Sequence, residues 1–157
     1  MKLYRYLFFA MVIILSACSN PELKFFESSD KAIEYGIKDQ KITHEEIIAE
    51  VDQLDERLII FKKDLPEGVG IGFASVSKKG EKYTWYQADP LTLVKQNNVD
   101  THPEIETIVK TFKGQEYRVH LGVLEDNNFP SDNRKNFNIG PIIDKDSGIY
   151  IYIYIEG

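Results

Sequence analysis

The sequence predicts an α+β domain in which an antiparallel β-sheet carries one or two short helices packed on one face. The prediction depends on three stretches. Residues 149–155 alternate isoleucine and tyrosine without a break, which is the two-residue period of a strand. Residues 69–87 hold two apolar-rich runs around the turn Lys78-Lys79-Gly80-Glu81, the pattern of a β-hairpin. Residues 31–37 show helical spacing.

The first helix is expected from Lys31 to about Ile37. Ile33 and Ile37 lie four residues apart and therefore share one helix face. Ser28-Ser29-Asp30 precede them and offer three candidate N-cap residues. Gly36 lowers the helix propensity of this segment.

Residues 44–61 fit two different structures. A helix would present an apolar stripe and begin with the capping box Thr43-x-x-Glu46. Two strands would instead be joined by a turn over residues 52–56. We favour strands from about Ala49, because the β-rich run that follows the turn ends in Lys62-Lys63-Asp64, with a proline and a glycine beyond.

One face of the first hairpin strand is almost without side chains, because Gly70, Gly72 and Ala74 all fall on it. Glycine inside a strand commonly marks the close approach of another backbone. We expect the helix over residues 31–37 to lie across this face.

A second short helix is expected after Thr101. Thr101 and Glu104 form another capping box, and Gly114 provides a stop. The apolar residues that follow have mostly helical spacing: Ile105, Ile108, Val109 and Phe112.

The last part of the chain is predicted as two strands separated by a long polar loop over residues 125–138. Residues 117–124 alternate, with Arg118, His120 and Gly122 on the polar side. The strand over residues 149–155 has isoleucine on one face and tyrosine on the other. Such an apolar strand would aggregate if it were unpaired, so we expect it in the middle of an antiparallel sheet.

The polar face of these two strands is the candidate binding surface. It combines Tyr150, Tyr152 and Tyr154 with Arg118 and His120. Tyrosine offers a rigid amphipathic surface for a protein or sugar partner. The alternative is that the tyrosines form a second buried layer under the helix or the long loop, and we favour this alternative.

The sequence predicts no catalytic residue, metal site or cofactor. His44, His102 and His120 are isolated, without the spacing of metal ligands. Asp144-x-Asp146-x-Gly148 is similar to part of a calcium loop, but a hairpin turn explains it more simply. The alternative to a binding domain is a weak hydrolase with His120 as base and a nearby carboxylate.

The N-terminus predicts export. Lys2 and Arg5 precede a charge-free stretch over residues 6–21, which is short for a transmembrane span of about 20 residues. It contains Leu15-Ser16-Ala17-Cys18, which resembles the lipobox of bacterial lipoproteins. The resemblance implies cleavage by signal peptidase II before Cys18 and a diacylglyceryl group on its sulfur. A plain membrane anchor, or secretion with a free thiol, are the alternatives.

This resemblance divides the chain into a signal peptide (1–17), a tether (18–29) and one globular domain (30–157). Removing residues 1–17 takes the formal net charge from −6 to −8, which disfavours nucleic acid as a partner. Cys18 is the only cysteine, so no intramolecular disulfide can form. Two acyl chains suffice for stable anchoring.

The mature region resembles small lipoproteins of Bacillus-type Gram-positive bacteria that have no assigned function. The likeness lies in the lipobox, Ser28-Ser29-Asp30, Ala32-Ile33-Glu34, and the paired runs 69–76 and 83–86. The expectation is a non-enzymatic binding or accessory domain on the extracytoplasmic side of the cell membrane. It would be held there through Cys18 and would bind a protein or envelope partner.

Overall fold

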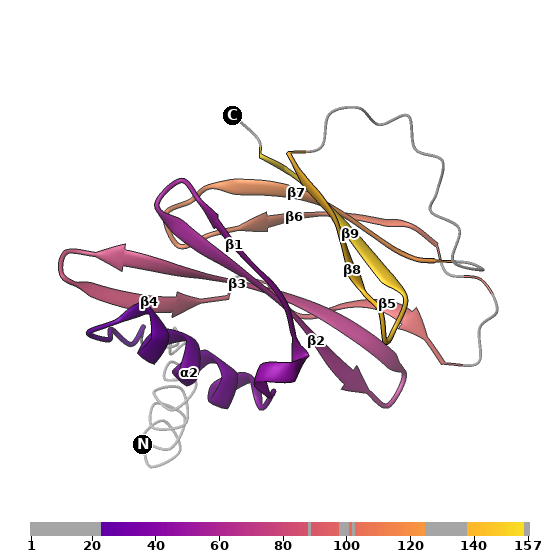
Figure 1. The fold of residues 1–157 in the computed structure, drawn as a ribbon, viewed down its shortest axis with the longest axis horizontal. Helices are drawn as coiled ribbons and strands as arrows, with labels where there is room; N and C mark the ends of the chain where they lie inside the picture. Colours follow the sequence, from indigo (N-terminus) through magenta and orange to yellow (C-terminus); the bar gives the residue numbers. More distant parts are fainter. Residues whose placement is uncertain (1–22, 88, 98–100, 102, 125–137, 156–157) are drawn as a thin grey trace, which may run out of the picture.

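The computed structural model describes residues 23–155, apart from 88, 98–100, 102 and 125–137. This part of the chain is mostly antiparallel β-sheet with one α-helix, as the α+β prediction requires in outline. It has two sheets where a single sheet was expected. Helix α2 (Ser29–Gln40) packs on the first sheet, and the second sheet covers the opposite face of the first (Figure 1).

The two sheets have different strand orders. Sheet A has the order β1-β2-β3-β4, and β5 also pairs with β3. Its strands are β1 (Ile47–Gln53), β2 (Glu56–Leu65), β3 (Gly68–Lys79), β4 (Lys82–Tyr86) and β5 (Thr92–Gln96). Sheet B has the order β6-β7-β9-β8. Its strands are β6 (Ile105–Lys110), β7 (Glu116–Val123), β8 (Ile139–Asp144) and β9 (Ile149–Ile155).

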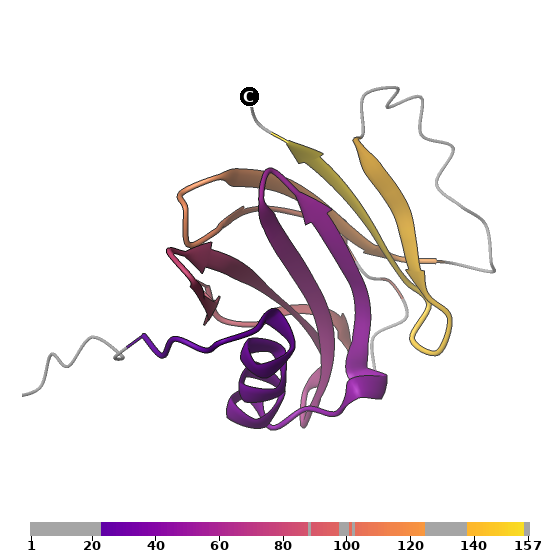
Figure 2. The same ribbon diagram turned by 60° about the vertical axis from the view of Figure 1, so that its left-hand side comes forward.

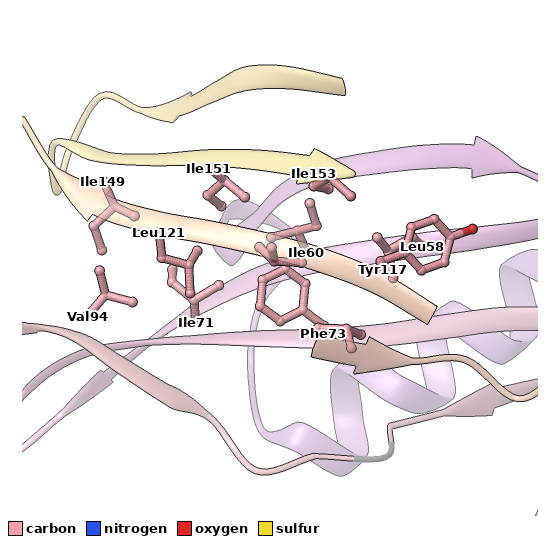
Figure 3. Packing of buried hydrophobic residues seen from close by; sticks show 12 residues of the cluster. Leu58, Ile60, Ile71, Phe73, Val94, Tyr117, Leu121, Ile149, Ile151 and Ile153 are labelled. Atoms are coloured by element: carbon pink, nitrogen blue, oxygen red, sulfur yellow. The ribbon is translucent and has the colours of Figure 1, made fainter. Parts of the chain in front are cut away.

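The main core lies between the two sheets (Figure 3). Strand β9 contributes its alternate isoleucines to this core, and Ile149, Ile151 and Ile153 are fully buried. They face a set of apolar side chains from both sheets: Leu58, Ile60, Ile71, Phe73, Val94, Val119 and Leu121. Strand β9 pairs with β7 on one side and β8 on the other, which confirms the predicted central position.

A second apolar layer lies between α2 and the other face of sheet A (Figure 2). The predicted helix is confirmed and extends from Ser29 to Gln40, with Ser28 as the N-cap that accepts from the amide of Lys31 at 3.2 Å. Gly36 lets the helix approach Trp85 so closely that a Cβ would overlap the indole ring. The close backbone approach therefore occurs at this glycine of the helix.

The helix does not cover Gly70 and Gly72, contrary to expectation. It packs further along β3, over Ala74 and Val76. The space beside Gly72 is filled by side chains, the ring of Phe61 from the neighbouring strand and Leu91. An aromatic ring folded over a neighbouring glycine thus takes the volume that we had assigned to the helix.

Residues 44–61 form strands, which was the favoured interpretation. The capping contact is present, since the Glu46 carboxylate accepts from the Thr43 amide at 2.6 Å, but it starts only a single 3-10 turn, η2 (His44–Glu46). Leu54 and Asp55 both adopt positive φ, 49° and 61°, and join β1 to β2 as a tight hairpin. Paired φ values of this sign are those of a type I′ turn, whose twist matches that of the strands.

The second predicted helix is wrong, because residues 105–110 form strand β6. Thr107, Ile108 and Val109 are consecutive β-branched residues, which fit a strand better than a helix. In the strand, Val109 is buried, whereas Ile108 points to the opposite face and is 49% exposed.

The chain enters the fold beside the helix. Phe26, in the segment predicted as a tether, exchanges two backbone hydrogen bonds with Tyr83 of β4, at 2.7 and 2.8 Å. Its ring lies 5.1 Å from that of Tyr35 on α2. The N-terminal segment therefore joins the molecule at sheet A, on the side away from sheet B (Figure 2).

Candidate functional site: the outer face of sheet B

The candidate binding residues lie together on the outer face of sheet B. In the pairing of β7 with β9, His120 is opposite Tyr152, Arg118 is opposite Tyr154, and Gly122 is opposite Tyr150. Because side chains alternate along a strand, all of these point away from the inter-sheet core. Strand β6 adds Glu106 and Ile108, opposite His120 and Arg118. We call this surface the tyrosine face: Glu106, Ile108, Arg118, His120, Tyr150, Tyr152 and Tyr154.

The three tyrosines differ in burial. Tyr150 is only 4% exposed, because its ring lies over Gly122, where a Cβ would overlap it. Its hydroxyl donates to Glu104 at 2.7 Å. Tyr152 packs edge-on against Tyr150 with 5.8 Å between ring centroids, and Tyr152 and Tyr154 are half-buried. Helix α2 covers none of them, since it lies on the far side of sheet A, and the loop over residues 125–137 lies outside the described residues.

Glu106 connects two basic side chains of the tyrosine face. Its Oε1 is 3.1 Å from Nη1 of Arg118, and its Oε2 is 3.1 Å from Nε2 of His120. The imidazole ring of His120 also packs edge-on against Tyr154, at 5.5 Å between centroids. Sequence analysis missed Glu106 as a member of this surface because residues 105–112 were assigned to a helix. Strict alternation of Glu106, Ile108 and Lys110 was the available signal.

The carboxylate that a His120 hydrolase would need is therefore present. However, Glu106 also forms an ion pair with Arg118 on the neighbouring strand. We call this set of cross-strand contacts, in which Glu106 bridges Arg118 and His120, the charge ladder. A cavity of about 470 Å³ lies elsewhere, at the β1–β2 turn, and Tyr83, Lys78 and Arg57 are among the residues that line it. The geometry around His120 is that of a sheet surface with cross-strand ion pairs.

The Asp144–Gly148 segment is the hairpin turn between β8 and β9. A lysine forms ion pairs with its two carboxylates. Nζ of Lys62 is 2.9 Å from both oxygens of Asp144 and 3.1 Å from Asp146. Asp144 also accepts from the hydroxyl of Ser147 at 2.6 Å. Lys62 belongs to β2, so the ion pair joins the two sheets. No group of three or more His, Cys, Asp or Glu side chains suited to a metal ion occurs in the described part of the chain.

This ion pair should make stability depend on pH at both extremes. Burial alone would raise the pKa of Asp144, but hydrogen bonds from Ser147 and Lys62 outweigh it and lower the pKa. Burial likewise opposes the charge on Lys62, but hydrogen bonds to Asp144 and Asp146 raise its pKa overall. The contribution of Asp144 is therefore complete above about pH 4 and is lost as pH falls through its lowered pKa. That of Lys62 is complete below about pH 10 and is lost as pH rises through its raised pKa.

Lys62→Met should lower the free energy of unfolding by about 2 kcal/mol at pH 7, since it leaves a largely buried carboxylate unpaired. The difference from the parent should shrink when Asp144 is protonated. Urea unfolding at pH 7 and pH 3 measures both effects. Lys31→Met, which removes an exposed pair with Glu27, is the matched control and should change stability little at either pH. An equal loss at both pH values would contradict the role of Asp144.

A buried carboxylate joins the sheets at the other end of the molecule. Glu56, the first residue of β2, is 5% exposed and accepts from the hydroxyls of Ser77 and Thr111 and from the amide of Lys113, the last at 3.2 Å. Thr111 and Lys113 belong to the β6–β7 turn. Burial, with the nearby charge of Glu56, raises the pKa of Tyr117. Sequence analysis placed Glu56 in a turn and did not identify this contact.

Comparison with known proteins leaves the geometry above as the basis for interpretation: no protein-family model, curated protein or solved structure matches the chain. The described helices include none with the length and hydropathy needed to cross a bilayer. Cys18 and its lipobox lie outside the described residues.

Proposed function

We propose that this chain is a lipid-anchored protein on the extracytoplasmic side of a cell membrane, and that its tyrosine face binds a protein or envelope component without catalysing a reaction. The resemblance of Leu15-Ser16-Ala17-Cys18 to a lipobox supports the anchor. A signal of this kind leaves the acylated cysteine as the first residue of the mature chain, at the end of a tether.

The entry point of the chain supports the proposed orientation. The described chain begins next to α2 and pairs with β4 through Phe26, so the tether reaches the molecule at the helix and sheet A. The tyrosine face lies on the outer side of sheet B, the layer farthest from the helix. An anchored molecule would therefore present this face away from the point of attachment.

The observation that carries the binding proposal is the composition of the outer face of sheet B. Ile108 is 49% exposed on the edge strand β6 of this face, Arg118 lies opposite it on β7, and two half-buried tyrosines follow on β9. Tyrosine and arginine are enriched in protein interfaces, and an exposed apolar side chain among them adds area that binding can bury. The His120–Glu106 contact of 3.1 Å supports the second candidate, a hydrolase with His120 as base, but the charge ladder explains that contact equally well.

Cys18→Ser should prevent lipidation, because Cys18 is the only cysteine and the only acceptor of the diacylglyceryl group. We expect the variant either to remain unprocessed or to leave the membrane. Membrane fractionation, together with the mass of the processed chain, measures this. Ser19→Ala is the matched control and should be processed as the parent is. A Cys18→Ser protein that is cut and membrane-bound like the parent would contradict the anchor.

A photoreactive side chain introduced at Tyr154 should crosslink to a partner in intact cells, because this position lies in the tyrosine face. Glu34, exposed on α2, is the matched control position on the opposite side of the molecule. We expect partner crosslinks from position 154 that are absent from position 34 and are reduced by the additional change Arg118→Glu. Crosslinks from position 34 alone, or equal yields from both, would contradict the proposal.

A further inference from the structure

Strand β6 forms one edge of sheet B and carries a pattern that is complementary to itself. Among the described residues it pairs only with β7. Its outward-facing side chains are Glu106, Ile108 and Lys110, an acid and a base placed symmetrically about an exposed isoleucine. Natural proteins often protect a sheet edge with charged side chains, and on β6 these charges are arranged so that they complement a second copy of the same strand.

The backbone of β6 also has the right direction for a further strand. Beyond its end, the amide of Thr111 donates to the carbonyl of Gln115 at 2.9 Å, in continuation of the register that places Val109 opposite Tyr117. In an antiparallel pair such bonds recur at every second residue. Thr107 and Val109 therefore direct their N–H and C=O groups to β7. The same groups of Glu106, Ile108 and Lys110 point to the open edge.

We propose that two copies of this chain associate by pairing their β6 strands antiparallel, with Ile108 of one copy opposite Ile108 of the other. Two-fold symmetry then places Glu106 opposite Lys110 of the second copy, and Lys110 opposite its Glu106. These three pairs involve the residues whose backbone groups face the edge, so each pair would exchange two backbone hydrogen bonds. Sheet B becomes continuous across the two copies.

Basic and acidic side chains already present on β7 extend this complementarity. Within one copy, Glu106 is opposite His120 and Lys110 is opposite Glu116, with ion-pair distances of 3.1 and 3.2 Å. Pairing of the edges would give a row of neighbouring side chains across the joined sheet. The row starts with His120 and Glu106 of one copy and continues with Lys110 and Glu116 of the second copy. Each acid in that row then has a basic neighbour, which favours cross-strand pairing.

Two other sheet edges lack this property. Strand β1 has Glu50 and Asp52 on either side of Val51, so symmetric pairing would place acid opposite acid. Strand β8 contains Pro141, which has no amide to donate to a partner strand. Of these three edges, only β6 carries a self-complementary pattern.

The pairing has a consequence for orientation that goes beyond the proposed function and does not depend on it. The two-fold axis of an antiparallel strand pair is perpendicular to the sheet. Both copies of α2, and both points at which the tethers enter, then lie on one side of the joined sheet, and both tyrosine faces lie on the other. Two anchored copies could pair while attached to the same membrane.

Cysteine crosslinking in membranes of cells that express the full chain tests the register. Ile108→Cys should form a disulfide-linked dimer, because hydrogen-bonded antiparallel pairs have Cα atoms about 5.5 Å apart, within the range of a disulfide. Glu106→Cys is the matched control, since the two copies of position 106 would be about 14 Å apart. Co-expressed Glu106→Cys and Lys110→Cys chains should crosslink to each other. The parent chain controls for any reaction of Cys18.

Charge reversal tests the complementarity, with the Ile108→Cys crosslink as readout. Glu106→Lys alone would oppose lysine to lysine, and Lys110→Glu alone would oppose glutamate to glutamate. Each should lower the crosslinked fraction roughly tenfold. A mixture of the two variants restores both opposite-charge pairs and should crosslink nearly as well as the chain that carries Ile108→Cys alone. Thermal unfolding of each variant verifies that it is folded.

The outcomes separate clearly. The pairing is supported if a cysteine at position 108 gives dimers and one at position 106 does not. It is further supported if each charge variant loses the dimer and the mixture of the two variants regains it. Equal crosslinking from positions 106 and 108, or folded charge variants that crosslink like the parent, would overturn it. Failure of this test would leave binding of a partner at Tyr154 unaffected, because that experiment uses a different readout.

Discussion

Replacing Glu56 with alanine should lower the free energy of unfolding by roughly 3–5 kcal/mol. The Glu56 carboxylate accepts from two buried hydroxyls, those of Ser77 and Thr111, and from the amide of Lys113. Alanine leaves all three donors in the protein interior without this acceptor. Because Ser77 belongs to sheet A and the other two donors to the β6–β7 turn, the change also loosens the attachment between the sheets. Urea unfolding followed by circular dichroism measures the loss.

Two further variants identify the cause of that loss. Glu56→Gln keeps the length and one acceptor oxygen of the side chain, and we expect it to lose less than half as much as alanine. Glu116→Ala removes a carboxylate from the same region whose side chain is 43% exposed, and it should change stability by less than about 0.5 kcal/mol. A loss below about 1 kcal/mol for Glu56→Ala would mean that the three donors find other acceptors.

Ile153→Ala should destabilise the protein by about 2–5 kcal/mol. Ile153 is completely buried in the core between the sheets, on the strand that β7 and β8 flank. Removing three carbon atoms there leaves a cavity that two paired sheets cannot easily close. Thermal unfolding against the parent measures the effect.

Tyr152→Ser is the matched control for this prediction, since Tyr152 is the adjacent residue and points to the opposite face. It is half-buried, so we expect a loss of about 1 kcal/mol and an intact fold. Sequence analysis favoured a covered tyrosine layer, for which both variants would be equally damaging. Equal losses would therefore show that the tyrosine face is a second core, and they would remove the basis of the binding proposal.

Elements defined by local pattern could be predicted from the sequence. The strict alternation over residues 149–155 predicted a central strand, because a strand with one wholly apolar face is stable only when both edges are paired. The first helix followed from Ser28 and from the spacing of Ile33 and Ile37, which are signals contained within a few residues. The shared face of Arg118, His120 and the tyrosines followed from the same two-residue period, given the antiparallel pairing of their strands.

The errors arose where distant residues decide the structure. Residues 105–110 have a helical capping signal and partly helical spacing, but hydrogen bonds to β7 and the burial of Val109 favour a strand. The glycines of β3 are covered by Phe61, whose position depends on the register between β2 and β3. Local sequence carries no information about that register.

The sequence by itself determined the helix, the hairpins and the alternation of faces, because the signal for each lies within a short segment. The export signal with its single cysteine is a prediction from the sequence of the same local kind. Only the tertiary structure decided that the strands divide into two sheets and that Glu56 and Lys62 each join them. It also decided that Glu106 belongs to the tyrosine face. These features depend on contacts between residues from 12 to 84 positions apart in the chain. Such contacts form only when the packing of the two sheets fixes which strands are neighbours.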